Sequence, residues 1–122
     1  MNDTLTNDAF ISDGEYREKA EALYEQIEEA VDRFAEERDA PMDYENTGGV
    51  LTIFLEDTDT QVIISRQAAT QQIWVAAKSG GFHCIYVEGH WRCTKTEETL
   101  DQLLSRTCSE QTKMDIHFDP FT

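Results

Sequence analysis

One hairpin-forming stretch decides how this chain folds: residues 72–87 read QIWVAAKSGGFHCIYV. Gln72–Lys78 and Phe82–Val87 are rich in β-branched and aromatic residues, which are typical of strands. Ser79-Gly80-Gly81 separates them and is a strong turn signal. The stretch therefore predicts two antiparallel strands joined by a tight turn.

The flanking residues extend this pattern. We expect strands at 50–55, 61–66 and 91–93, and 42–45 is a candidate first strand, joined to the next through Gly48-Gly49. Because the turns between these segments are too short for crossover connections, neighbouring strands must run antiparallel. The sequence thus predicts one antiparallel sheet of five or six strands.

A long amphipathic helix is predicted before the sheet, at residues 15–38. Ser12 or Asp13 is suited to cap its start, and Pro41 follows its end. Its apolar residues recur at helical spacing and share one face. They are Tyr16, Ala20, Leu23, Ile27, Ala30, Val31 and Phe34.

A second helix is predicted after the sheet, from Glu97 to Cys108, with Thr94 or Thr96 as its cap. We therefore expect an α+β fold. It is a two-layer sandwich in which the N- and C-terminal helices cover one face of the antiparallel sheet. The length of 122 residues fits a single domain, 1–122, in which residues 1–13 form a frayed N-terminus.

The composition excludes several functions. Acidic residues number 25 against 10 basic ones, and the formal net charge is −15. Such a protein is repelled by nucleic-acid backbones and by anionic membrane surfaces, so we expect neither as a partner. No apolar run is long enough to span a bilayer, and the first residues do not resemble a signal peptide. Three cysteines without CxxC spacing favour free thiols, and we expect a cytoplasmic protein.

The negative charge is concentrated on one side of the first helix. Residues 1–45 hold 15 acidic and 4 basic side chains. Projected on a helix, eight carboxylates fill a stripe of about 100° opposite the apolar face. They are Glu18, Glu21, Glu25, Glu28, Glu29, Asp32, Glu36 and Asp39. Each like-charge pair spaced four residues apart costs about 0.2–0.5 kcal/mol, and a solvated surface does not need that repulsion.

The stripe suits a positive ligand, and two kinds remain open beside a plain acidic surface. One is a hard cation such as Fe²⁺, Fe³⁺, Mn²⁺ or Ca²⁺ bound by oxygen atoms, because the stripe has no His or Cys for zinc or copper. A single convex helix would bind it weakly, at several overlapping places. The other is a basic protein surface, whose attraction weakens with salt.

The predicted sheet offers a second candidate surface around Trp74. If helices cover the face that carries Ile73 and Val75, then alternation turns Gln72 and Trp74 toward solvent, beside Arg66 or Gln67 of the neighbouring strand. An exposed Trp of this kind is suited to anchor a protein partner.

No catalytic arrangement is evident. The sequence contains no phosphate-binding Gly-rich loop, no HExxH motif and no EF-hand motif. It also shows no recognisable nucleophile–base pair. We therefore expect no enzyme and assign no catalytic residue.

Several segments resemble the frataxin family, closest to its bacterial CyaY type. Gly48–Thr52 is similar to the family's second-strand entry, and Ser65–Ala76 to its central signature N-x-Q-x-P-x-x-Q-I-W-L-A. Lys78–His83 and Trp91–Cys93 continue the resemblance, which covers about residues 15–118. Ser65 replaces Asn, Ala69 stands roughly at the Pro, Val75 replaces Leu, and two extra residues follow the acidic helix.

The resemblance implies weak iron binding along an acidic ridge and a regulatory role in iron–sulfur cluster assembly, by docking on a cysteine desulfurase and a scaffold protein. It also implies a protein that is a monomer or a metal-induced oligomer. The ridge would comprise Glu28, Glu29, Asp32, Glu36, Glu37, Asp39, Asp43 and Glu45, which our projection extends to Glu21 and Glu25. Gln67, Gln72 and Trp74 would meet the assembly complex. The alternatives are an acidic interaction module without a metal and a ferroxidase-type enzyme.

Overall fold

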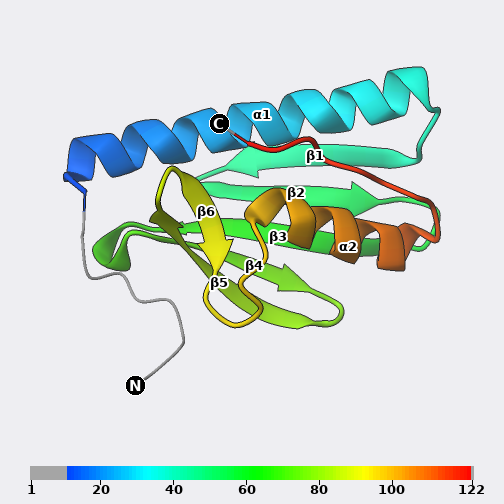
Figure 1. The fold of residues 1–122 in the computed structure, drawn as a ribbon. Helices are drawn as coiled ribbons and strands as arrows, with labels where there is room; N and C mark the ends of the chain where they lie inside the picture. The colour runs from blue at the N-terminus through cyan, green and yellow to red at the C-terminus, as the bar shows by residue number, and fades with distance from the viewer. Residues whose placement is uncertain (1–10, 122) are drawn as a thin grey trace.

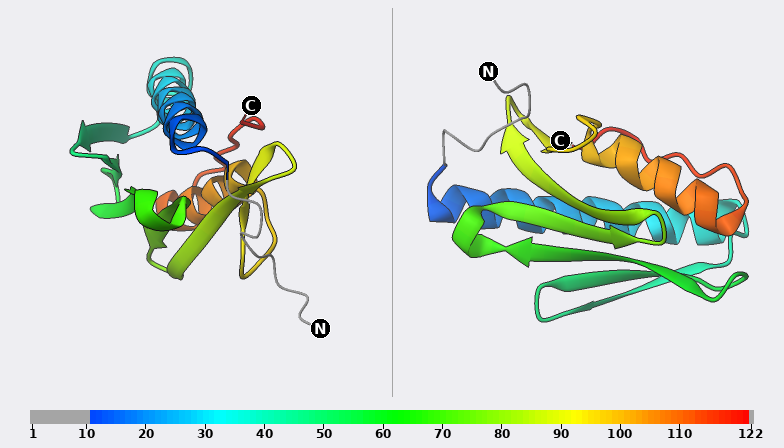
Figure 2. Two further views of the ribbon diagram at one scale, coloured as in Figure 1. Left: turned by 90° about the vertical axis from the view of Figure 1, so that its left-hand side faces the viewer. Right: turned by 90° about the horizontal axis from the view of Figure 1, so that it is seen from below.

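The computed structural model describes residues 11–121. Figure 1 shows the elements in chain order: α1 (Asp13–Glu37), β1 (Met42–Thr47), β2 (Val50–Leu55), β3 (Thr60–Gln67), the 3₁₀ turn η1 (Ala68–Thr70), β4 (Gln72–Ala77), β5 (Gly80–Val87), β6 (His90–Cys93) and α2 (Leu100–Thr112). The strands form one antiparallel sheet in the order β1-β2-β3-β4-β5-β6. Both helices lie on one side of it (Figures 1 and 2), which confirms the predicted α+β sandwich.

The core lies between the two helices and the covered face of the sheet. Every apolar residue predicted for the inner face of α1 is buried, and Tyr24 joins them. Alternate residues of the strands, such as Ile53, Ile64 and Ile73, belong to the same buried cluster on the sheet side. Leu103 of α2 joins this cluster from the helix layer. The period-two and helical patterns of the sequence thus identified the same core from both layers.

The start of α1 is set by a capping box. Ser12 Oγ accepts a hydrogen bond from the Glu15 N–H (3.1 Å), and the Glu15 carboxylate accepts one from the Ser12 N–H (3.3 Å). The helix therefore begins at Asp13, two residues earlier than predicted. Most of the segment expected to be frayed, residues 1–10, lies outside the described residues.

The second helix differs from its prediction at both ends. Glu97 has a left-handed φ of 65°, so the helix cannot begin there, and Thr99 caps it instead of Thr94 or Thr96. It continues past Cys108 to Thr112, and its last turn packs the polar residue Gln111 into the core. The Gln111 side chain accepts from the Lys78 N–H (2.8 Å) and donates to β3, so its burial leaves no bond unmade.

The turn between β1 and β2 is fixed to the helix layer. Gly48 and Gly49 have φ of 61° and 83°, as a two-residue hairpin turn requires. The buried Tyr24 hydroxyl donates to the Gly49 carbonyl oxygen (2.7 Å) and lies 3.1 Å from the Ile64 carbonyl oxygen. This link holds α1 in register over the first three strands. Among residues 11–121, neither helix is long and apolar enough to cross a membrane.

Candidate functional site

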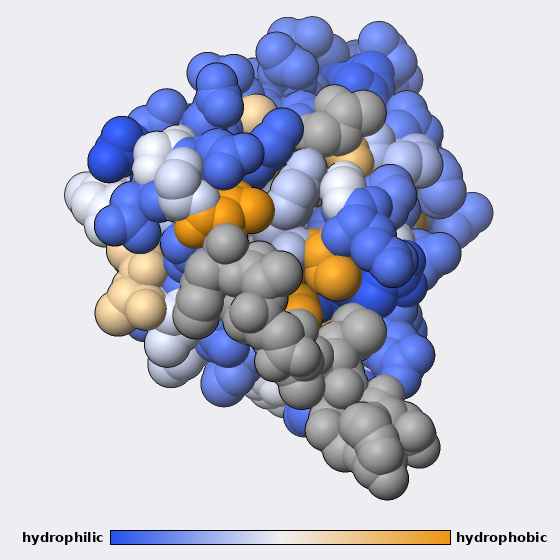
Figure 3. Space-filling view, turned by 60° about the vertical axis from the view of Figure 1, so that its left-hand side comes forward, coloured by the Kyte–Doolittle hydropathy of each residue, from blue (hydrophilic) through white to orange (hydrophobic). Residues whose placement is uncertain are grey.

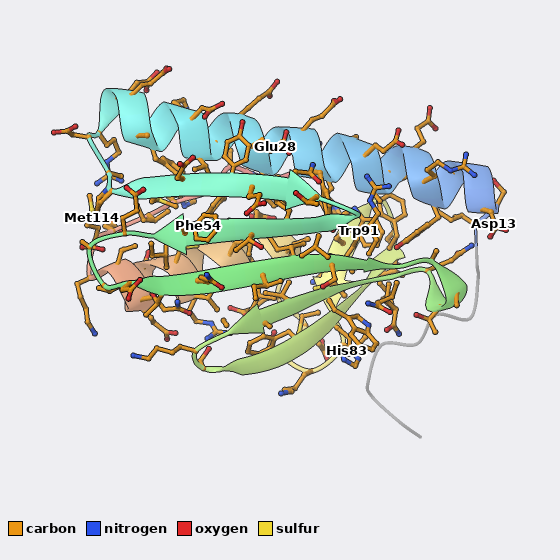
Figure 4. All side chains as sticks on the ribbon, turned by 180° about the vertical axis from the view of Figure 1, so that it is seen from behind. Asp13, Glu28, Phe54, His83, Trp91 and Met114 are labelled. Atoms are coloured by element: carbon orange, nitrogen blue, oxygen red, sulfur yellow. The ribbon has the colours of Figure 1, made fainter. Side chains whose placement is uncertain are left out.

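The acidic ridge is an open row of carboxylates along α1 and the neighbouring strand. We define it as Glu21, Glu25, Glu28, Glu29, Asp32, Glu36, Glu37, Asp39, Asp43 and Glu45. All are exposed except Glu28, which is half-buried, and oxygen-tipped side chains stand along the outer side of α1 in Figure 4. Within residues 11–121, none of them forms an ion pair with a Lys or Arg side chain. The negative charge of the ridge is therefore left uncompensated by the fold.

Two ridge carboxylates tie α1 to β1. Glu28, labelled in Figure 4, accepts a hydrogen bond from the Asn46 side-chain amide (2.7 Å). One turn later, Asp32 accepts one from the Tyr44 hydroxyl (3.3 Å). Desolvation and, after it, the negative charge of Asp32 raise the pKa of Tyr44. The Asp43 carboxylate accepts a hydrogen bond from the Tyr44 N–H (2.8 Å) and so lies beside the contact between α1 and β1.

The remaining ridge residues are not gathered into a cage. Glu29 lies at the opposite edge of the stripe from Glu28, where it lines a shallow hollow with Arg33, Asp119 and Phe121. No three His, Cys, Asp or Glu side chains of the described residues converge to hold one metal ion. What the ridge offers is a succession of exposed oxygen donors, whose chemistry suits a hard, hydrated cation or a basic protein surface.

The uncovered face of the sheet carries the second candidate surface. Val50, Ser65, Trp74 and His83 are successive cross-strand neighbours on β2, β3, β4 and β5, and we call them the Trp74 row. Trp74 is 38% exposed and Val50 37%, and no other large hydrophobic residue among 11–121 is as exposed. The Trp74 and His83 rings stack at 4.4 Å with 9° between their planes. Figure 4 views this face and labels His83 on it.

The three predicted partner-binding residues share this face, as expected. Gln72 Oε1 accepts a hydrogen bond from Trp74 Nε1 (2.6 Å), and Gln67 is paired with Gln72 across the strands. Arg66 behaves differently from the prediction, because alternation sends it to the covered face. There its guanidinium lies 4.9 Å from the centre of the Tyr24 ring, and its Nε is buried without a hydrogen-bond partner.

Val50 and His83 belong to this surface but were missed by sequence reasoning. The alternation of 50–55 already placed Val50 opposite the core residues Leu51 and Ile53, so its exposure was readable. The position of His83 over Trp74 depends on the register of β4 and β5, which the sequence does not specify residue by residue. At the end of the molecule seen in Figure 3, by contrast, hydrophilic side chains dominate the coloured surface.

A six-stranded antiparallel sheet under two terminal helices, with an acidic first helix, defines a frataxin-like α+β protein. Residues 9–114 match the family described as "Frataxin-like domain". The "Iron-sulfur cluster assembly protein CyaY" of Pseudomonas aeruginosa is 43% identical over 110 residues, covering 88% of this chain and 97% of that protein. The chain belongs to the frataxin family.

Two solved structures agree with this assignment. A frataxin of the CyaY family from Psychromonas ingrahamii superposes with a TM-score of 0.77 at 32% identity, covering 89% of this chain and 99% of that one. Yeast frataxin superposes with a TM-score of 0.67 at 17% identity, covering 93% and 98%, and shows the shared fold alone.

Proposed function

We propose that this protein takes part in iron–sulfur cluster assembly, where it binds iron weakly and regulates the rate of cluster formation. The observation that carries the proposal is the uncompensated acidic ridge, in a chain that matches a protein named for cluster assembly over nearly its whole length. A cation bound along α1 would relieve the repulsion between its carboxylates, so binding there would be favourable.

Iron suits the donor set of the ridge. Its ligands are all carboxylate oxygens, which favour Fe²⁺, Fe³⁺ and other hard cations over zinc or copper. Because the donors form a row rather than a cage, each ion would keep most of its water and exchange readily. We expect several overlapping weak sites, with iron as a cargo rather than a resident cofactor.

Docking would use both surfaces. The ridge would steer a basic patch of a cysteine desulfurase, and the Trp74 row would supply an anchor for the desulfurase or the scaffold protein. In this proposal the protein acts by binding and not as an enzyme. It is a monomer in the absence of iron, with oligomers formed only under metal load.

The first test is an anaerobic Fe²⁺ titration followed by NMR. We compare wild type with a ridge variant carrying Glu25→Gln, Glu28→Gln, Glu29→Gln and Asp32→Asn. A control removes four exposed charges that lie outside α1 and β1, in the β2–β3 and β5–β6 turns: Glu56→Gln, Asp57→Asn, Asp59→Asn and Glu88→Gln. The ridge variant should lose most of its iron-induced shifts, and the control should keep them. Equal iron uptake by the ridge variant would reject these residues as the site.

The second test measures docking and regulation in a desulfurase-coupled cluster assay. The ridge variant should bind the desulfurase more weakly, and wild-type binding should fall as salt rises. Trp74→Ala should weaken binding at all salt concentrations. If the ridge variant loses docking but keeps its iron uptake, the protein is an acidic interaction module. Oxygen-dependent Fe²⁺ turnover above the buffer rate would favour the ferroxidase alternative.

A further inference from the structure

Two of the three cysteines face each other across the edge of the sheet. Cys84 on β5 is the direct cross-strand partner of Cys93 on β6, and both are completely buried under α2 and the loop before it. The Thr94 N–H donates a hydrogen bond to the His83 carbonyl. The Cys93 N–H donates to the Glu98 carbonyl and not to the carbonyl of Cys84. The two cysteines therefore occupy a non-hydrogen-bonded position of the ladder.

That position has the spacing a disulfide needs. At a non-hydrogen-bonded antiparallel pair the Cα atoms lie about 4.5 Å apart and the side chains point the same way. Disulfides span Cα separations of about 4.4–6.8 Å. The two residues could thus be bridged without moving the strands. Cys108, on α2, is equally buried but has no second cysteine in contact and is a free thiol like the other two.

The surroundings give the two thiols different roles. Cys93 Sγ accepts hydrogen bonds from the Cys84 thiol and from the Thr96 N–H (3.5 Å), and these hold the pKa of Cys93 well below its usual value. The same thiol hydrogen bond and burial raise the pKa of Cys84. Burial alone raises the pKa of Cys108 to about 12. Because the Thr96 N–H donates to Cys93 Sγ, we assign the thiolate to Cys93 and the second thiol to Cys84.

We propose that Cys84 and Cys93 form a reversible intramolecular disulfide, so that the β5–β6 edge is an oxidation site for peroxides. The Cys93 thiolate attacks one oxygen of hydrogen peroxide, which gives a sulfenic acid and releases hydroxide. The Cys84 thiol then attacks that sulfur, forms the S–S bond and releases water. Overall, two thiols and one peroxide give one disulfide and two waters, and a dithiol reductant reverses the reaction.

Access comes from local opening of β6. This strand has four residues and lies at the edge of the sheet, where β5 pairs with it along one side. The single bridge between Arg92 and Thr99, contacts with α2 and the packing of Trp91 against Tyr16 also hold it. Short edge elements open at lower free energy than the core. A small oxidant can reach the pair in this way, whereas Cys108 is exposed only when α2 leaves the sheet. Cys108 is thus an internal control for global unfolding.

The test is peroxide titration of the reduced full-length protein, followed by unfolding, alkylation with N-ethylmaleimide and mass spectrometry. We expect a loss of two alkylated thiols, a peptide pair joining Cys84 to Cys93, and recovery with dithiothreitol. Cys108 should remain alkylated throughout. Three alkylated thiols after peroxide, or oxidation of Cys108 at the same rate, would overturn the proposal.

A variant separates the two roles. In Cys84→Ser the sulfenic acid on Cys93 cannot be resolved, so dimedone should trap it as an adduct at that residue. Adduct formation at Cys108 instead would contradict the assignment of Cys93 as the attacking thiol. The wild-type mapping does not depend on this variant being stable. Neither result depends on iron binding or on docking, so this inference and the proposed function fail separately.

Discussion

Removing one ridge charge should stabilise the protein, because the ridge is held against its own repulsion. Glu25 has carboxylates four residues away on both sides, Glu21 and Glu29, and it makes no hydrogen bond or ion pair within residues 11–121. Glu25→Gln abolishes both repulsive pairs. At about 0.2–0.5 kcal/mol each, the gain in the free energy of unfolding is about 0.4–1 kcal/mol. For a domain of this size that corresponds to a Tm increase of roughly 1–5 °C.

The matched control is Glu28→Gln on the same helix. This substitution relieves the repulsion with Asp32, but it also weakens the bond that Glu28 accepts from Asn46 at 2.7 Å. Hydrogen bonds to charged groups contribute more than neutral ones, so the two effects oppose each other and the Tm should stay level or fall. The comparison distinguishes relief of repulsion from a general effect of Gln on the helix.

Thermal unfolding followed by circular dichroism, in 10 mM and in 1 M salt, provides the assay. The Debye length shortens from about 30 Å to about 3 Å over this range, so the gain from Glu25→Gln should nearly vanish at high salt. A lower Tm for Glu25→Gln at low salt would show that its carboxylate makes a favourable contact. A gain that is unchanged in 1 M salt would refute the electrostatic explanation.

Three further predictions test the fold. Tyr24→Phe should lower the free energy of unfolding in urea by about 1–2 kcal/mol, because the Gly49 carbonyl loses its donor. Tyr44→Phe should change it little, because the half-buried Tyr44 makes its hydroxyl bond to Asp32 at the solvent-exposed surface. Arg106 donates two hydrogen bonds to the Glu98 carboxylate and lowers its pKa. Glu98 therefore stabilises the folded protein above its unfolded pKa of about 4.3, and this contribution is lost as pH falls through the lower folded pKa. Wild type should therefore be more stable than Glu98→Gln at pH 7, and the two should converge at lower pH. Gly49→Ala should cost about 1–2 kcal/mol at its φ of 83°, while Gly81→Ala, with no close neighbour and no positive φ, should be nearly neutral.

The fold was predictable because its periodicities are strong. The inner face of α1 and the alternating strands could be read directly, and both proved to form the core. The ends of α2 could not, because they depend on tertiary contacts. Glu97 is held in a left-handed turn, and the buried Gln111 bonds to β3 and to the turn after β4, partners that the local sequence does not reveal.

The candidate site was predictable as a set of residues but not as a set of contacts. Helical projection identified which carboxylates share the outer side of α1. It could not show that Glu28 and Asp32 bond to β1, because that depends on how the helix lies over the strand. In the same way, the pairing of Cys84 with Cys93 needs the register of β5 and β6, which no spacing in the sequence specifies.

The ridge and the Trp74 row are close enough at one point for a single partner to touch both. Thr47 at the end of β1 pairs with Val50, which begins the row, and the preceding Asn46 holds Glu28 of the ridge. A partner that covers this corner would contact both surfaces together. Its affinity losses from Glu28→Gln and Val50→Ala should then be coupled in a double-mutant cycle, by more than the roughly 0.5 kcal/mol seen for independent sites. Additive losses in desulfurase binding, measured by calorimetry, would instead mean that the two surfaces engage different partners or act independently on one.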